Sequence, residues 1–202
     1  MENRVSAVLL ASGFSRRMGE DKLLLTFNGT TLLQKSVDLL SSLPVYEKII
    51  VATAERAESI AIPPGIQVVV NANPEAGQSE SVKLGVSMAA GDWYIFMAAD
   101  QPKLTVTDMQ PFFDAVGQGN GSIIYPVING YPSSPTLFSS CFRSDLLSLT
   151  GDTGGRAVRE RNREVCVEIE PEYPGNFIDI DNMEDYHSLT TDTELSEKNE
   201  AY

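Results

Sequence analysis

Histidine and cysteine are nearly absent from this chain. Its 202 residues contain one histidine, His187, and two cysteines, Cys141 and Cys166, without any Cys-x-x-Cys spacing. With so few of these residues, a disulfide framework, a zinc ribbon and a histidine-dependent catalytic triad are not indicated. We expect His187 to lie on the surface and the protein to work in a reducing cytoplasm.

Positive charge is also scarce. The chain has 15 Lys and Arg against 28 Asp and Glu, which gives a formal net charge of −13 at pH 7 and a pI near 4.4. Because a strongly acidic surface repels polyanions, we expect neither nucleic acid nor an anionic membrane as a general partner.

Long apolar segments are missing as well. No run approaches the roughly 20 apolar residues that a membrane-spanning helix needs. The apolar run Val5–Ala11 is short, follows Glu2 and precedes Arg16, so we interpret it as a strand rather than an export signal.

The sequence does contain a regular alternation of strand and helix signals. This pattern predicts an α/β fold in a single domain, with a doubly wound and mostly parallel sheet. Buried strands are expected at Val5–Leu10, Lys48–Ala52, Gln67–Asn71, Trp93–Ala98 and Ser122–Val127. We expect the domain to cover residues 1–189 and the polar tail at 190–202 to be disordered.

Two of the covering helices have clear boundary signals. Thr31 followed by Gln34 predicts a capping box, and the helix that it starts ends before Pro44. A second helix is expected from Ser79 to Ala90, with Gly91 ending it.

The segment from Leu9 to Lys22 is the most informative part of the chain. An apolar strand leads into a loop bracketed by Gly13 and Gly19, whose backbone amides can turn toward phosphate oxygens. Arg16, Arg17 and Lys22 supply positive charge, so the loop is typical of a nucleotide triphosphate site. The nucleotide-binding candidates in it are Leu10, Ala11, Ser12, Gly13, Ser15 and Arg16.

Two better-known phosphate loops do not match. Glu20 follows Gly19 where a Walker A motif needs lysine, and no G-x-G-x-x-G occurs. A plain strand-to-loop corner with solvated cations is the alternative interpretation of this segment.

Two later loops also follow expected strands, where ligands bind in doubly wound sheets. In the first, Asn71, Gly77, Gln78 and Ser79 offer donors and acceptors for a base or ribose, although Ser79 is equally suited to capping the helix. In the second, Asp100 is a candidate Mg²⁺ ligand, with helix capping as its alternative role.

The segment Leu9–Lys22 resembles the L-A-A-G-x-S-x-R-M-G-x-x-K signature of the nucleotidyltransferase family that includes the molybdenum cofactor guanylyl- and cytidylyltransferases. Ser12 replaces an alanine or glycine of that signature. Asp100-Gln101-Pro102 is similar to the family's D-Q-P element, and residues 177–186 resemble D-I-D-T-P-E-D-Y, with Asn182 and Met183 in place of Thr-Pro.

This resemblance implies a Rossmann-like, GT-A-like nucleotidyltransferase fold and a set of catalytic residues. Arg17, Lys22 and Asp100 would be catalytic, and Asp100 and Asp181 would hold Mg²⁺ or Mn²⁺. Alternation along an expected strand places Asp179 and Asp181 on the same face, so Asp179 is an alternative second ligand or a partner of the ligand.

Two more elements point to the acceptor side of the family's site. Residues 151–156 are similar to G-D-x-G-A-R, and residues 135–138 resemble the end of G-x-P-x-L-F, although the Arg-Gly-His usually found upstream is missing. The acceptor-binding candidates are Ser81, Pro135, Asp152 and Arg156. A surface pair between Arg156 and Asp152 is the alternative.

The resemblance implies transfer of CMP from CTP to the phosphate of molybdenum-loaded molybdopterin, with release of pyrophosphate. The dinucleotide product would serve molybdenum hydroxylases, whose apo-protein is a possible partner. Guanylyltransferase relatives have glycine at the position of Ser12, so a side chain there favours CTP. The alternatives are guanylyl transfer, transfer to a sugar phosphate, and a non-enzymatic cofactor carrier.

Overall fold

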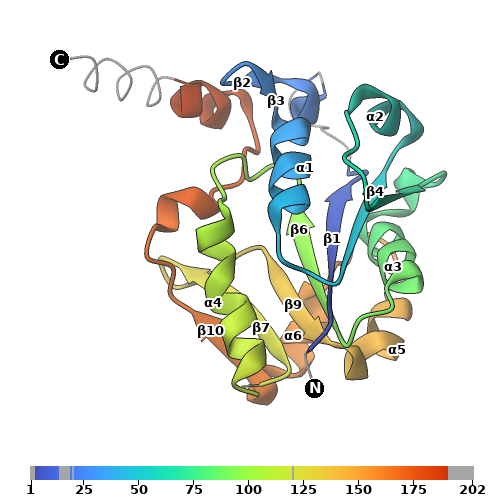
Figure 1. Ribbon diagram of the computed structural model, residues 1–202, viewed down its shortest axis with the longest axis vertical. Helices are drawn as coiled ribbons and strands as arrows, with labels where there is room; N and C mark the ends of the chain where they lie inside the picture. Colours follow the sequence, from blue (N-terminus) through green and yellow to red (C-terminus); the bar gives the residue numbers. More distant parts are fainter. Residues whose placement is uncertain (1–2, 14–18, 20, 120, 191–202) are drawn as a thin grey trace.

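A central sheet with helices on both faces forms the body of the protein (Figure 1). The computed structural model describes residues 3–13, 19, 21–119 and 121–190. The main strands are β1 (Val5–Ala11), β4 (Glu47–Ala52), β5 (Ile66–Val70), β6 (Trp93–Ala98), β7 (Ile123–Ile128), β9 (Thr136–Ser139) and β10 (Cys166–Ile169). They lie in the order β10-β7-β9-β6-β1-β4-β5, and β8 (Tyr131–Pro132) pairs with β7.

Most of the sheet is parallel. β1 pairs in parallel with both β4 and β6, β4 with β5, and β10 with β7. β9 lies antiparallel between β6 and β7. The predicted mostly parallel sheet is confirmed, and β9 is its one central antiparallel strand among the described residues.

The two faces of the sheet bury different helices because successive side chains of a strand point to opposite sides. Ala7 and Leu9 of β1 belong to the core under α1 (Leu32–Ser42) and α4 (Val106–Gly117). Val8 belongs to the core under α3 (Gln78–Met88), α5 (Arg143–Leu147) and α6 (Arg156–Arg161). β1 is therefore buried on both faces, as its continuous apolar sequence predicts.

The shorter elements occupy the connections. They are the hairpin β2 (Thr26–Phe27) and β3 (Thr30–Thr31), helix α2 (Ala54–Ser59), a helical segment at 183–190, and the 3₁₀ turns η1 (Lys22–Leu24), η2 (Pro74–Ala76), η3 (Ser140–Phe142), η4 (Arg163–Val165) and η5 (Pro174–Phe177). Within the described ranges, every helix is too short or too polar to cross a membrane.

The boundary signals predicted for two helices differ from the structure. Thr31 Oγ1 accepts from the backbone N of Gln34, but the Gln34 side chain reaches Asp38 and Ala61 instead of returning to Thr31, so only half of the capping box forms. Ser79 does not cap its helix, because α3 starts one residue earlier, at Gln78, and Gly77 is the N-cap residue. That helix ends at Met88, two residues before the predicted Ala90.

The segment containing Asp179 and Asp181 is also different from the expectation. Both were expected on one face of a strand, but residues 178–181 form no strand. The backbone N of Ile180 donates to the carbonyl O of Asp100 at 3.0 Å, so this segment crosses the end of β6 as an extended loop. The predicted tail at 190–202 lies, apart from residue 190, outside the described residues.

Candidate active site

A cleft of about 890 Å³ opens at the carboxyl ends of β1 and β6. Its walls come from the start of the loop after β1, the loop before α3, the loop after β6, the segment leading into α6, and the loop at 179–181. The carboxyl ends of parallel strands are where ligands bind in such sheets. Segments that are far apart in the sequence therefore meet at one place.

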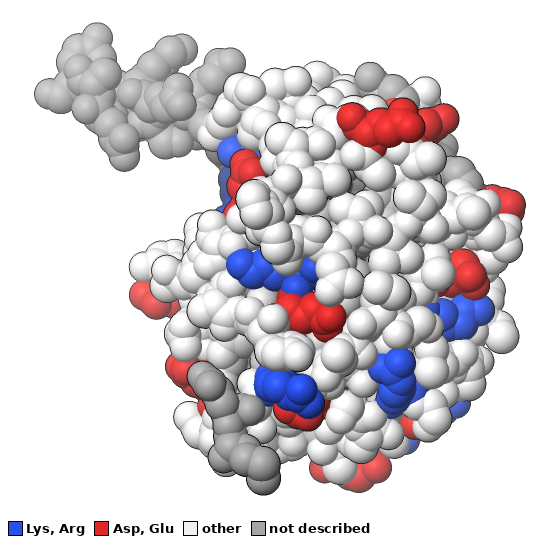
Figure 2. All heavy atoms as spheres, turned by 45° about the vertical axis from the view of Figure 1, so that its right-hand side comes forward, with Lys and Arg blue, Asp and Glu red and all other residues white. Residues whose placement is uncertain are grey.

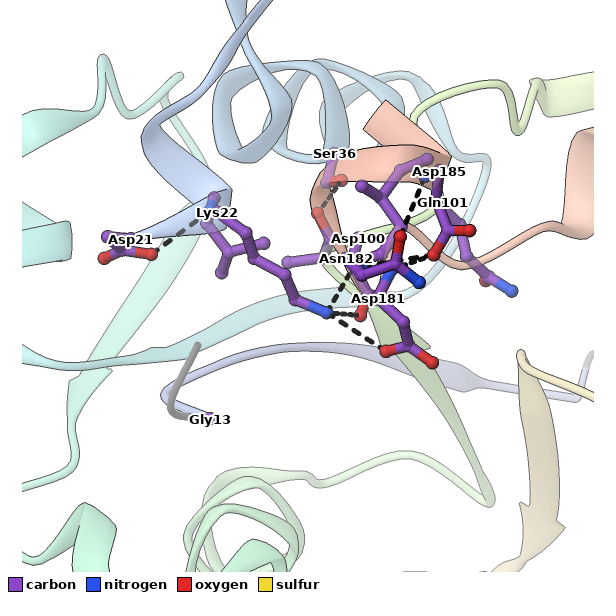
Figure 3. A network of polar contacts seen from close by, with 12 residues as sticks. Gly13, Asp21, Lys22, Ser36, Asp100, Gln101, Asp181, Asn182 and Asp185 are labelled. Atoms are coloured by element: carbon purple, nitrogen blue, oxygen red, sulfur yellow. Dashed lines mark hydrogen bonds and ion pairs between the residues drawn. The ribbon is translucent and has the colours of Figure 1, made fainter. Parts of the chain in front are cut away.

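Lys22 is the centre of a charged group in this cleft (Figure 3). Its ammonium lies 2.7 Å from Asp100 Oδ2, 2.8 Å from the carbonyl O of Ile180 and 3.5 Å from Asp181 Oδ1. Lys22 comes from η1, Asp100 follows β6, and Asp181 precedes the segment at 183–190. The structure thus brings together three of the residues proposed from the sequence.

Asp179 adds a third carboxylate to the group. It lines the cleft, and its pKa is raised to about 7. The main cause is desolvation by the surrounding protein, followed by the negative charges of Asp100 and Asp181, while Lys22 acts in the opposite direction. More carboxylates therefore meet here than one lysine can neutralise.

The residues of this group fit a hard divalent cation. Among the residues that the structure describes, the buried Asp100 Oδ1 has no hydrogen-bond partner. Carboxylate oxygens are the ligands that Mg²⁺ and Mn²⁺ prefer. Among the described residues, no three His, Cys, Asp or Glu side chains are arranged to hold a metal by themselves. A metal here would be held by one or two carboxylates together with substrate oxygens, which is the usual mode for Mg²⁺.

Helix capping fixes the position of Asp181. Asp185 Oδ2 accepts from the backbone N of Asn182, and Asn182 Oδ1 accepts from the backbone N of Asp185. This reciprocal pair is a capping box for the helical segment at 183–190. Asp185 Oδ2 also accepts from the backbone N of Asp181, so the departure from Thr-Pro at 182–183 keeps a rigid helix start beside Asp181.

Gln101 is a positioning residue that the sequence reasoning left without a role. Its side chain is only 2% exposed and donates to the carbonyls of Ser134 and Phe177 at 3.1 and 3.0 Å. It joins the loop after β6 to the start of β9 and to η5. The D-Q-P element thereby places Asp100 and holds the neighbouring loop that carries Asp179 and Asp181.

Arg56 of α2 holds the two described ends of the loop after β1. It donates to both carboxylate oxygens of Asp21, at 2.7 and 2.8 Å, and to the carbonyls of Ala11 and Gly13, both at 2.8 Å. Arg56 is buried, with 5% of its surface exposed. Asp21 in turn accepts from the backbone N of Leu23 at the start of η1. This clamp fixes the turn from which Lys22 reaches the carboxylates, and sequence reasoning missed it.

A buried hydrogen-bond network supports the nucleotide side of the cleft. Asn71 Nδ2 donates to Ser12 Oγ at 3.1 Å and to Ser81 Oγ at 3.3 Å, and the two serine hydroxyls also bond to each other. Ser12 and Ser81 line the cleft, whereas Asn71 lies behind them. In this structure, Asn71 positions cleft residues instead of lining the cleft.

The loop before α3 packs against the segment before α6. Gly77 has φ +91°, and a Cβ on it would lie 2.5 Å from the carbonyl carbon and oxygen of Gly151. The backbone N of Gln78 donates to Asp152 Oδ1 at 3.4 Å, and that of Ser79 donates to the carbonyl of Gly151 at 3.2 Å. The nucleotide and acceptor walls predicted from the sequence are thus in direct contact.

Two arginines of α6 line the cleft. Arg156 is exposed and pairs with Glu160, at 2.6 Å from Nε to Oε1, so the alternative pair with Asp152 is wrong. Arg159 was not singled out from the sequence, although it is three residues after Arg156 and therefore on the same helix face. It is 9% exposed and its guanidinium lies 4.6 Å from the centroid of the Tyr125 ring.

Most of the candidate residues line the cleft. Those that do are Leu10, Ser12, Gly13, Lys22, Gly77, Gln78, Ser81, Asp100, Asp152, Arg156, Asp179 and Asp181. Four candidates are buried and are not among the cleft-lining residues: Ala11, Asn71, Ser79 and Pro135. Ser15, Arg16 and Arg17 lie outside the described residues. His187 is exposed, as expected.

The face drawn in Figure 2 carries both signs of charge. Among the residues described there, basic side chains lie beside acidic ones instead of forming one continuous basic surface (Figure 2). The carboxylates and cations of the cleft are therefore a local arrangement on a protein whose net charge is −13.

Several proteins of known sequence are similar to this chain. It is 33% identical over 111 residues to a probable molybdenum cofactor guanylyltransferase from Trichormus variabilis, which covers 54% of this chain and 51% of that protein. It is 30% identical over 192 residues to the purine catabolism protein PucB of Bacillus subtilis, covering 89% and 92%. It is 26% identical over 186 residues to the molybdenum cofactor cytidylyltransferase of Escherichia coli, covering 90% and 93%. The chain thus spans about half the length of the first relative.

Solved structures share the fold. A nucleotidyl transferase from Methanothermobacter thermautotroptrophicus superposes with a TM-score of 0.78 at 23% identity, covering 96% of this chain and 99% of that one. Rv0371c of Mycobacterium tuberculosis, in complex with manganese, superposes with a TM-score of 0.76 at 21% identity, covering 93% and 98%. The predicted Rossmann-like nucleotidyltransferase fold is confirmed. A model of the MobA-like NTP transferase domain matches residues 7–165, more than half of the chain, and the chain therefore belongs to the MobA-like NTP transferase family.

Proposed function

We propose that this protein transfers the CMP group of CTP to the phosphate of molybdenum-loaded molybdopterin and releases pyrophosphate. The observation that carries the proposal is the cluster of Lys22, Asp100 and Asp181 in the cleft. Relatives named as molybdenum cofactor cytidylyl- and guanylyltransferases support it. The product would be a dinucleotide cofactor for a molybdenum hydroxylase, and we place the reaction in the cytoplasm.

The transfer joins two anionic groups, so its main requirement is charge neutralisation. A phosphate oxygen of the acceptor attacks the α-phosphorus of CTP in line, a new P–O bond forms, and the bond to the leaving pyrophosphate breaks. The attacking phosphate is already ionised near neutral pH, so no general base is needed. Lys22 stabilises the developing negative charge, and we propose the same for Arg17, which lies outside the described residues.

Asp100 and Asp181 would hold Mg²⁺, with Asp179 as the alternative to Asp181. When bound, the cation supplies Lewis-acid polarisation of the phosphates and orients them. The unpartnered Oδ1 of Asp100 supports this assignment. Mn²⁺ takes the same oxygen ligands, and the manganese complex of the structurally similar Rv0371c is consistent with its use.

The chain's own residues position both substrates. Leu10, Ser12, Gly13, Gly77 and Gln78 line the nucleotide side. Ser12 is 2% exposed, lines the cleft and is bonded through its hydroxyl to Ser81, and we propose that its side chain leaves less room for a base than a glycine would. This favours a pyrimidine and hence CTP.

Guanylyl transfer is the second candidate. The relative from Trichormus variabilis is named a probable guanylyltransferase and is 33% identical over the matched region. Incubation of the purified protein with molybdenum-loaded molybdopterin, Mg²⁺ and each of CTP, GTP, ATP and UTP separates the two functions. Mass spectrometry is expected to detect the cytosine dinucleotide, whereas a guanine dinucleotide would support the second candidate.

Two other outcomes would redirect the proposal. Transfer to a sugar phosphate without any pterin would keep the chemistry and change the acceptor. Tight binding of the pterin with no dinucleotide from any of the four triphosphates would contradict the enzymatic proposal and support a cofactor carrier.

A further inference from the structure

Arg159 is a nearly buried cation in the wall of the cleft. Its residue surface is 9% exposed, and it lines the cleft together with Thr136, Phe138 and Gly155. The guanidinium stacks over the Tyr125 ring at 4.6 Å from the ring centroid. A guanidinium carries five N–H donors in a planar fork, and stacking on an aromatic face leaves the edge of that fork available for hydrogen bonds.

No carboxylate is paired with this guanidinium among the described residues. Glu160 is adjacent in the sequence, but its carboxylate accepts from Arg156 at 2.6 Å. Glu168 accepts from the hydroxyl of Tyr125 at 2.8 Å. These two carboxylates are therefore engaged with other partners.

A charge in this environment needs compensation. Burial lowers the pKa of Arg159 and the neighbouring Arg156 acts in the same direction, whereas Tyr125 and Glu160 act in the opposite direction. Buried arginines are usually paired with an anion, because removing a charge from water is costly. The side chain borders an open cleft, so a ligand can supply that anion.

We propose that Arg159 binds a phosphoryl group of the acceptor substrate through its guanidinium fork. The inference rests on the proposed function and deepens it, because it moves the acceptor contact from Arg156 to Arg159. A phosphate fits because guanidinium and phosphate form two parallel hydrogen bonds. The acceptor is its source because Arg159 comes from α6, beside β9, whereas the triphosphate is assigned to the loop after β1.

Inorganic phosphate is the probe for the first experiment. The side-chain Nε–H signal of Arg159 is followed by ¹H–¹⁵N NMR while phosphate is titrated into the full chain without nucleotide. We expect a saturable shift of this signal. Arg161→Gln is the matched control, since Arg161 is exposed on the same helix and does not line the cleft, and we expect it to change the apparent Kd by less than about threefold. A signal that does not move, or a shift that Arg156→Gln abolishes, would overturn the proposal.

A second experiment, on enzyme kinetics, tells whether Arg159 binds a phosphate of the acceptor or of the nucleotide. Arg159→Lys keeps the positive charge and allows a cation–π contact with the Tyr125 ring but loses the planar fork, and we expect the protein to stay folded. We expect it to raise the KM for the acceptor about tenfold and to leave the KM for the nucleotide nearly unchanged. A rise in the nucleotide KM alone would assign Arg159 to the triphosphate and contradict the acceptor assignment.

The NMR and kinetic experiments together test the proposed reaction and the role of Arg159 separately. A wild-type protein that shows the phosphate-dependent NMR shift but transfers no nucleotide would refute the proposed reaction and uphold Arg159 as a phosphate ligand. A protein that transfers nucleotide but shows no shift at Arg159 would uphold the reaction and refute this inference.

Discussion

Single side chains decide the chemistry of the cleft, and Lys22 shows how. Its ammonium contacts Asp100 and Asp181 and also the carbonyl of Ile180, so one cation organises loops from three parts of the chain. Its side chain is 15% exposed, and a partly buried charge interacts more strongly than an exposed one. Lys22 therefore has both a positioning role and an electrostatic role.

Lys22→Gln removes the positive charge that contacts Asp100 and Asp181. We expect the turnover rate to fall about 100-fold or more, because a preorganised charge at the reacting phosphates is lost. Steady-state kinetics with the preferred triphosphate measure the effect. Lys83→Gln is the matched control, since Lys83 pairs with Glu80 on the surface of α3 and does not line the cleft. Equal losses in the two variants would contradict the role of Lys22.

At the scale of elements, the clamp of Arg56 connects α2 to both described ends of the loop after β1. The sequence gives no motif for it, because the contact joins residues 35 to 45 positions apart. Its four hydrogen bonds satisfy two backbone carbonyls and one carboxylate. Local sequence patterns report helix caps and strand periods but not such long-range contacts.

Arg56→Met keeps much of the packing volume and removes the clamp. We expect the free energy of unfolding to fall by about 3 kcal/mol, because Asp21 and the carbonyls of Ala11 and Gly13 lose a nearly buried partner. Urea unfolding measures the change. Glu55→Gln, one residue earlier on α2 and exposed, is the control and is expected to change stability by less than about 0.5 kcal/mol. If Arg56→Met changed the free energy of unfolding as little as Glu55→Gln, the stabilising role of the Arg56 contacts would be refuted.

Gly77 tests the contact between the loop before α3 and the segment before α6. Gly77→Ala places a Cβ at 2.5 Å from the Gly151 carbonyl, on a backbone with φ +91°. We expect a loss of at least about 2 kcal/mol in unfolding free energy, from strain and from separation of the two loops. Gly175→Ala is the control, because nothing lies within 4 Å of a Cβ there. Thermal unfolding measures both variants, and equal unfolding midpoints would contradict this packing.

At the scale of the whole molecule, the sequence predicted the longer strands of the sheet better than the shortest ones. β1 and β6 are apolar runs that are buried along almost their whole length, and their positions follow from burial on both faces. β4 is buried from Ile49 to Ala52, whereas β5 lies at the edge of the sheet and is only partly buried; both have short apolar runs that made them recognisable. β9 and β10 are only 4 residues long each and were not predicted. Their place depends on pairing with β7, which is a tertiary contact.

The candidate site follows the same division. Lys22, Asp100 and Asp181 belong to motifs, and they meet in the structure because each follows or precedes an element that the sheet positions. Arg56 and Arg159 belong to no motif, and Gln101 belongs to the D-Q-P element but had no role assigned from the sequence. Their roles come from burial and partners, which only the folded chain provides.

The central claim is nucleotidyl transfer that depends on the carboxylates of the cleft. Mg²⁺-dependent pyrophosphate release with CTP and molybdenum-loaded molybdopterin tests it, comparing the wild-type protein, Asp100→Asn and the control Asp92→Asn. Asp92 is an exposed partner of Arg4 and does not line the cleft. We expect release by the wild type and by Asp92→Asn, and a decrease of about 100-fold or more in Asp100→Asn. Undiminished release by Asp100→Asn, or no release by the wild type with any triphosphate, would contradict it.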